Sequence, residues 1–286
     1  MIMIRLRRGF TMIEVSLFLA ITGALFIAVT AGVQNSIAQQ RYNDSVQNFV
    51  EFLRSAYAET MNVQSADNGR SEQAIYGKLV TFGESQGLEG NDSKGGGGNR
   101  IFVYDVIGDA EGNVGNQVIS ALIGVGANVI VANNDGSAVA PAGIVESYLP
   151  RWASSIEPAC SDAACEYEPI KAAVLVVRHP RSGTVYTYTM NGRTVEVNEA
   201  ISRANDQVRS GNSAEDAAIN NNPLKKILEE KTGGFEMKQL DFCLNPYAGE
   251  VNTTRADIRL PEGARNSSAI QVIAEFSVEG GNKCLR

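Results

Sequence analysis

An uncharged, almost wholly apolar run near the N-terminus constrains this chain more than any other feature of its sequence. Residues 15–33 carry only apolar or small side chains, and no charged residue occurs from Val15 to Gln40. About 20 such residues cross the hydrocarbon core of a bilayer as a helix. Arg5, Arg7 and Arg8 precede the run, and by the positive-inside rule they hold that end of the chain in the cytoplasm. The sequence therefore predicts a single-pass precursor in the cytoplasmic membrane, with the rest of the chain exported.

Two other interpretations of this run are a secretory signal peptide and a buried core helix. A secretory signal has a shorter apolar core that ends at a small-residue cleavage site. Here the run is longer, and the helical pattern continues beyond the small residues at positions 30–32. A core helix rarely follows an arginine-rich N-terminus and stays uncharged for so long. We therefore expect a membrane helix that is retained.

The helical pattern continues after the apolar run as an amphipathic segment. Apolar residues recur at the spacing of one helix face, namely Tyr42, Val46, Phe49, Val50, Leu53, Tyr57 and Met61. No proline interrupts residues 10–61. One helix of about 50 residues would be roughly 75–80 Å long. We expect its second half to bury the apolar face against a globular domain.

Two glycines, Gly23 and Gly32, lie within the first half of this helix. Each costs up to about 1 kcal/mol relative to alanine in a helix interior. They can allow close helix–helix packing in the membrane, or they can be points of helix flexibility where the helix unwinds. Both interpretations stay open from the sequence.

The residues RRGFTMIE at positions 7–14, followed by the apolar run, resemble the N-terminus of type IV pilins and the related pseudopilins. The family pattern is a short basic leader that ends in glycine, then phenylalanine, a small hydroxyl residue, two apolar residues and glutamate. Gly9, Phe10, Thr11 and Glu14 occupy the corresponding positions here. The resemblance covers about the first 35 residues, and it does not include the proline that the family often has in the second half of the span.

This resemblance implies that a prepilin peptidase cuts between Gly9 and Phe10 and methylates the new amino group of Phe10. The leader holds three of the 25 basic residues and no acidic residue, so the mature chain has 22 basic and 32 acidic side chains, a net charge of about −10. A lone carboxylate near the hydrocarbon boundary is costly and calls for a partner. The resemblance implies that Glu14 of one subunit pairs with the Phe10 amine of the next during assembly. Glu14 lying merely at the lipid headgroups is the alternative.

The sequence predicts four parts: a leader at 1–9, a transmembrane or filament-core helix half at 10–34, an amphipathic helix half at 35–62, and an extracellular globular domain at 63–286. Alternating or continuous apolar patterns predict strands in the globular part, at 74–84, 100–108, 169–190, 235–245, 256–261 and 269–278. Residues 116–133 are ambiguous between strands and a short helix, and 179–183 read as a turn. The expected fold is α+β, with the long N-terminal helix packed on a mainly antiparallel sheet, as the resemblance to pilins also implies.

Four cysteines follow the apolar run, at Cys160, Cys165, Cys243 and Cys284. The first two are spaced C-x4-C without a histidine nearby, whereas zinc sites favour tighter pairs and more ligands. We therefore expect disulfides, which an exported domain would form in an oxidising compartment. The four can pair in more than one way, and we favour Cys160–Cys165 and Cys243–Cys284 because the members of each pair share a local stretch of chain. The resemblance likewise implies a disulfide in the C-terminal region.

No set of residues in this sequence indicates catalysis, a metal site or a cofactor. The single histidine, His179, is expected at a surface turn, and the Gly-rich stretch 87–99 lacks the order of a phosphate-binding loop.

We therefore expect a non-enzymatic major or minor pilin in an extracellular filament, with other pilin subunits, the prepilin peptidase and the membrane assembly machinery as partners. A pseudopilin of a type II secretion system and a non-polymerising membrane-anchored binding protein are the alternatives. Net negative charge disfavours direct nucleic-acid binding, but a local basic patch would still allow it. Adhesion, motility and DNA uptake are not distinguished.

Overall fold

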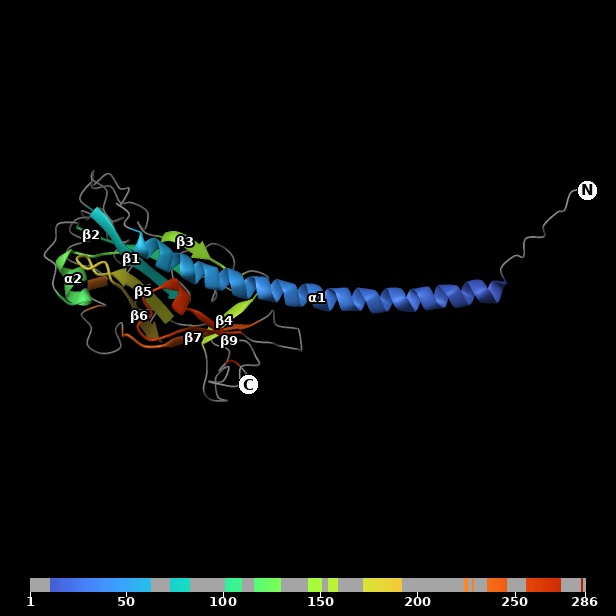
Figure 1. Cartoon of the computed structure of the whole chain (residues 1–286). Helices are drawn as coiled ribbons and strands as arrows, with labels where there is room; N and C mark the ends of the chain where they lie inside the picture. Colours follow the sequence, from blue (N-terminus) through green and yellow to red (C-terminus); the bar gives the residue numbers. More distant parts are fainter. Residues whose placement is uncertain are drawn as a thin grey trace, which may run out of the picture. The chain divides into compact units, whose positions relative to one another are not determined.

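The helix α1, Met12–Met61, runs without a break through 50 residues. It belongs to a computed structural model that describes residues 11–62, 73–82, 101–109, 116–129, 144–150, 154–158, 172–191, 224–225, 228, 236–245, 256–273 and 284. The chain divides into two compact units, one ending at Asp44 and the other beginning at Ser45. The first is formed by the N-terminal segment of α1, and the second contains the rest of α1 and all the strands. The long N-terminal helix of the sequence prediction is thus confirmed (Figure 1).

A five-stranded sheet, sheet A, forms the larger part of the second unit. Its order is β3-β2-β1-β5-β6, and every neighbouring pair is antiparallel. The strands are β1 Gln73–Phe82, β2 Ile101–Asp109, β3 Ile144–Tyr148, β5 Ala172–Arg178 and β6 Val185–Asn191. The first six residues of β5, AAVLVV, are all buried, which agrees with a strand covered on both faces.

A second antiparallel sheet, sheet B, has the order β4-β7-β8-β9. Its strands are β4 Ser155–Pro158, β7 Leu240–Asn245, β8 Ala256–Leu260 and β9 Gln271–Ile273. The short helix α2, Val118–Gly124, buries Val118, Ala121 and Leu122 on one face of sheet A, where Leu224 and Leu228 join the same core. The fold is therefore α+β, as predicted, with the strands divided between two sheets.

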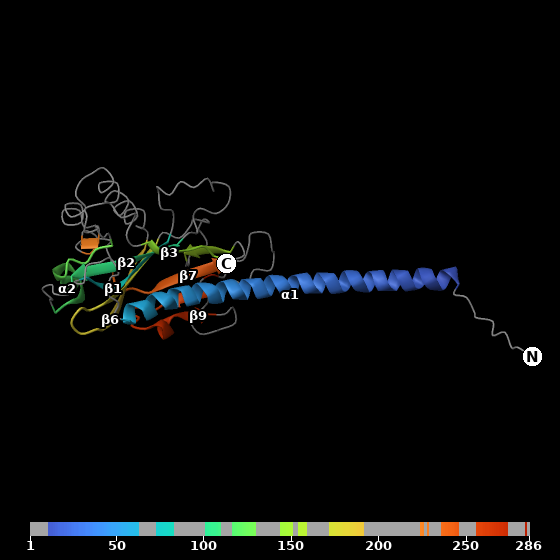
Figure 2. The ribbon, with the colours of Figure 1, turned by 90° about the horizontal axis from the view of Figure 1, so that it is seen from above.

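The second half of α1 buries the apolar face that the sequence indicates. Val46, Phe49, Val50, Leu53 and Tyr57 are all buried, and Phe52 and Ala56 extend this face. At its end the helix departs from the prediction, because Met61 is 44% exposed. In both views the strands of the two sheets lie beside this half of α1 (Figures 1 and 2).

Aromatic side chains join this half of α1 to both sheets. The Phe49 ring lies 6.3 Å from the Phe82 ring of β1 and 5.7 Å from the Phe242 ring of β7. The rings of Phe82 and Phe242 are themselves 4.8 Å apart, and Phe52 stacks on Tyr148 at 4.5 Å. Phe49, Phe82 and Phe242 are each fully buried, so the helix and the two sheets share one core.

Most of the strand predictions are confirmed, with three differences. The structure adds β3 and β4, which the sequence patterns did not indicate, and the last predicted strand begins two residues later than expected, at Gln271 of β9. The predicted strand residues 274–278 lie outside the described residues. The ambiguous segment 116–133 forms α2 at its start.

His179 does lie at the predicted turn between β5 and β6, but the expectation of a surface side chain was wrong, because it is 6% exposed. Its Nδ1 accepts hydrogen bonds from the backbone N–H groups of Arg181 and Ser182, so the imidazole folds back onto its own turn.

Candidate functional site

The N-terminal segment of α1 exposes large apolar side chains from Met12 to Val33, and again at Ile37. Among the described residues, α1 is the one helix long and apolar enough to cross a membrane. Its large apolar side chains are exposed by between 42% and 89% from Met12 to Ile37. Water disfavours this exposure by about 25 cal/mol per Å² of apolar surface, so the segment requires lipid or other apolar helices around it.

Glu14 and Thr11 cap the N-terminus of α1 through three mutual hydrogen bonds. The backbone N–H of Thr11 donates to Glu14 Oε2 at 3.0 Å, and the Thr11 hydroxyl donates to the same oxygen at 3.1 Å. The backbone N–H of Glu14 in turn lies 3.3 Å from Thr11 Oγ1. This is a capping box, which gives partners to N–H groups that the first turn of a helix leaves unpaired. The T-x-x-E spacing was visible in the sequence, but the prediction did not assign Thr11 this role.

Three hydroxyl side chains of the apolar segment bond to the helix itself. Ser16 donates to the Met12 carbonyl at 2.7 Å, Thr22 to Phe18 at 2.8 Å and Thr30 to Phe26 at 2.9 Å. A hydroxyl without a partner would be costly in hydrocarbon. These internal bonds let the segment lie in an apolar environment without leaving those three donors unpaired.

Gly23 and Gly32 lie in regular helix and have open space beside them. A methyl group added at either position would meet no atom within 4 Å. The predicted flexibility at these glycines stays a prediction, as do the predicted roles of Gly9 and Phe10, which lie outside the described residues. The same holds for Cys160 and Cys165.

Where α1 meets sheet A, a buried lysine lies between two carboxylates, and we call these three residues the Lys78 cluster: Glu59, Lys78 and Asp105. Lys78 Nζ lies 2.5 Å from Glu59 Oε2 and 2.6 Å from Asp105 Oδ1. The Lys78 side chain is 3% exposed, that of Asp105 15% and that of Glu59 41%. Burial alone would lower the pKa of Lys78, but the two adjacent carboxylates outweigh it and raise that pKa above its usual value. The sequence did not predict this cluster, because a lysine within a predicted strand is normally expected to point to solvent.

A hydrogen-bonded chain of two hydroxyls links α1 to β6 of sheet A and to the turn that follows β8. The Thr187 hydroxyl of β6 donates to the Ala264 carbonyl at 2.5 Å. Tyr57 Oη lies 2.8 Å from Thr187 Oγ1, so the tyrosine hydroxyl must be the donor in that contact. Burial raises the pKa of Tyr57 to about 12, which keeps its hydroxyl protonated at neutral pH.

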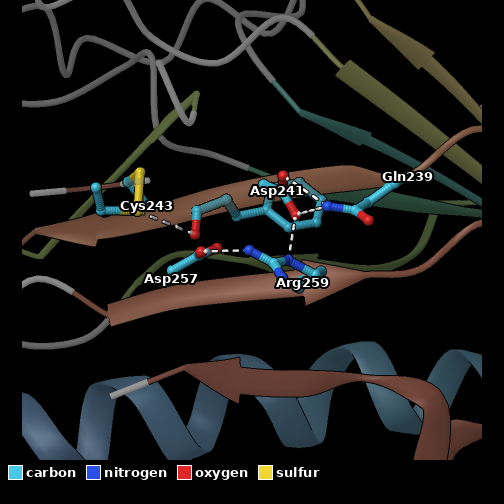
Figure 3. The surroundings of a disulfide bond; sticks show 7 residues. Gln239, Asp241, Cys243, Asp257 and Arg259 are labelled. Carbon is cyan, nitrogen blue, oxygen red and sulfur yellow. Dashed lines mark hydrogen bonds and ion pairs between the residues drawn. A yellow bond between two sulfur atoms is a disulfide. The ribbon is translucent and has the colours of Figure 1, made fainter. Parts of the chain in front are cut away.

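The disulfide predicted between Cys243 and Cys284 is present and fixes the residue near the C-terminus to β7. Figure 3 shows it beside a charged network on β7 and β8. Arg259 Nε donates to Asp241 at 3.0 Å, and Arg259 Nη2 donates to Asp257 at 3.1 Å. Gln239 adds a second donor to Asp241 at 2.8 Å. The guanidinium thus links two carboxylates across adjacent strands.

No group of three or more metal-ligating side chains occurs within the parts of the chain that the structure describes. Comparisons of the whole chain with protein-family models, with curated proteins and with solved structures found no match. The candidate site is therefore defined by its own geometry: an exposed apolar helix segment with one carboxylate in its first turn.

Proposed function

We propose that this protein is a type IV pilin-like subunit that is inserted in the cytoplasmic membrane, trimmed after Gly9 and packed through its N-terminal helix into an extracellular filament. The observation that carries the proposal is the contrast between the two halves of α1. Residues 12–37 expose nearly every large apolar side chain, whereas Val46–Tyr57 bury one face in a folded core. A membrane satisfies the exposed half before assembly, and neighbouring subunits satisfy it afterwards.

Glu14 has a role in this proposal that the capping box supports. Its carboxylate accepts a hydrogen bond from the backbone N–H of Thr11, and Phe10, whose amino group cleavage would create, is the preceding residue in the sequence. In a bundle of apolar helices an unpaired carboxylate is expensive, whereas one paired with a cation is tolerated. The Phe10 amine of a neighbouring subunit would supply this cation and set the axial register of the filament.

The test is the substitution Glu14→Ala in the full chain, with Glu51→Ala on the exposed polar face of the same helix as the matched control. Leaving the partner amine buried and unpaired costs about 3–5 kcal/mol, so incorporation into sheared filaments should fall roughly 100-fold or more. The Glu14→Ala precursor should still reach the membrane and be cut. Incorporation equal to that of Glu51→Ala would contradict the assembly role.

The N-terminus of the assembled protein tests processing separately. Mass spectrometry of sheared filaments should find a chain that begins with N-methylated Phe10. A chain that retains Met1 would overturn the prepilin proposal. Recovery of the cut chain only from the membrane and periplasm, with no surface filament, would favour a pseudopilin.

A further inference from the structure

In the Lys78 cluster a buried amine contacts two carboxyl groups. The proposed filament function does not involve these three residues. Asp105 Oδ1 is buried and has no hydrogen-bond partner among the described residues, although Lys78 Nζ lies only 2.6 Å away. The contact therefore has the distance of a hydrogen bond without its angles. A carboxyl carbon lies one bond from its oxygen, so Nζ is also within about 4 Å of Asp105 Cγ. Reacting atoms in near-attack geometries are separated by about 3–3.5 Å. A small movement of Nζ toward Asp105 Cγ would therefore bring the two atoms within reacting distance.

The backbone holds the two side chains in this position. Lys78 and Asp105 are directly opposed residues of β1 and β2, and Val176 opposes Lys78 on β5. Val80, two residues along β1, and Val176 are each 1% exposed, so the lysine stem lies among apolar groups. Gly77, the residue before Lys78, brings β1 close to β5, because a Cβ there would lie 2.2 Å from the Val176 carbonyl oxygen. The amine and the carboxyl group therefore cannot easily move apart into water.

Burial favours the neutral acid at Asp105, whereas at Lys78 the two carboxylates outweigh burial, so the uncharged amine forms only when one of them takes its proton. Burial raises the pKa of Asp105, against the opposing effect of the Lys78 ammonium. The resting cluster holds an ammonium between two carboxylates, and transfer of one proton from Nζ to Asp105 gives an uncharged amine beside an uncharged acid. Glu59 Oε2, 2.5 Å from Nζ, is within reach to accept the second proton that Nζ loses.

We propose that Lys78 and Asp105 condense into an intramolecular isopeptide bond, with Glu59 as the catalytic proton carrier. The Nζ lone pair attacks Asp105 Cγ and forms the C–N bond, and Glu59 takes a proton from nitrogen. Glu59 then returns this proton to the departing hydroxyl of Asp105, the C–O bond breaks, and one water leaves. No electrons are exchanged and no co-reactant is needed. The product is an amide between the central strand of sheet A and its neighbour.

The bond is tested by tryptic digestion of the purified full-length protein after its cysteines have been reduced and alkylated. Trypsin does not cut after an acylated lysine, so residues 71–94 should stay together and be joined to the peptide that begins at Ile101. The joined species should be lighter by one water than the sum of its two peptides. Full recovery of a free peptide ending at Lys78 from the wild-type protein would overturn the proposal. This outcome is independent of filament assembly.

Variants and an internal control separate the chemistry from folding. Lys78→Arg and Asp105→Ala should give no joined peptide. Glu59→Gln should form it at least about 100-fold more slowly, as expected when a general acid–base is lost. An equal rate in Glu59→Gln would remove Glu59 from the mechanism. Lys238, which forms an exposed ion pair with Glu236, should be cut normally in every sample. Formation of the Cys243–Cys284 disulfide in each variant shows that the domain has folded.

Discussion

At the scale of a residue, the Tyr57 side chain of α1 contributes to the stability of the globular unit through one buried hydroxyl. The residue is 1% exposed, and its hydroxyl begins the chain that continues through Thr187 to the Ala264 carbonyl. A buried hydroxyl of this kind adds about 1 kcal/mol of net stability. It also couples stability to alkaline pH, because its pKa in the folded state is raised to about 12.

We expect Tyr57→Phe to lower the free energy of unfolding by about 1 kcal/mol at pH 7. At alkaline pH the difference in the free energy of unfolding between wild type and variant changes sign, so the variant becomes the more stable of the two. A phenol with a raised folded-state pKa stabilises fully below its unfolded-state pKa of 10.0, and this contribution is lost as pH rises toward about 12. The variant should therefore lose less stability than wild type between pH 10 and about 12, by about 2–3 kcal/mol. Urea denaturation at pH 7 and pH 11.5 measures both effects, and parallel pH profiles would contradict the burial of this hydroxyl.

At the scale of elements, β1 depends on a glycine that its sequence pattern does not explain. Gly77 follows an irregularity in the pairing of β1 with β2, and it lies against the backbone of β5. A Cβ at this position would lie 2.2 Å from the Val176 carbonyl oxygen and 2.8 Å from Val177 Cα. These are backbone atoms that cannot move without separating the two strands.

Gly77→Ala should therefore destabilise the globular unit by about 3 kcal/mol or more, in the range of strongly overpacked core substitutions. Gly23→Ala in α1 is the control, because no atom lies within 4 Å of its added methyl group. That change should leave the unfolding of the globular unit unaffected. Thermal unfolding followed by near-ultraviolet circular dichroism compares the two, and equal melting temperatures would contradict the close approach of β1 and β5.

The Cys243–Cys284 disulfide acts at the scale of the whole molecule, because it closes a loop with a sequence separation of 41. In the chain-entropy model a loop of this size is worth about 3–4 kcal/mol. The double variant Cys243→Ala/Cys284→Ala should lose about this much stability in urea denaturation. Addition of a reductant should lower the midpoint of the wild-type protein by more than that of the double variant, in which the predicted Cys160–Cys165 bond would be left for the reductant to break. A wild-type midpoint insensitive to full reduction would show that the loop is held by other contacts.

The sequence was sufficient to predict the features that repeat along the chain. The apolar stripe from Val46 to Tyr57 and the β-rich runs depend on local periodicity, so the long helix and most strands could be identified. The pairing of Cys243 with Cys284 followed from their shared stretch of chain. The Lys78 cluster could not be predicted, because its three members come from α1, β1 and β2 and only the folded topology brings them together. The burial of His179 was not predicted either, because the turn sequence alone does not show that its imidazole accepts from the backbone N–H groups of Arg181 and Ser182.

The contact between Phe49 and Phe242 has a consequence for the order of synthesis. A ribosome makes α1 early, but the β7 strand that covers part of its apolar face comes close to the end of the chain. Contacts between such distant parts of a chain form late and slow the folding of a domain. Until β7 has emerged, Phe49 and the apolar face around it have no permanent cover. The apolar face of α1 is therefore covered by this part of the core only after β7 has been made.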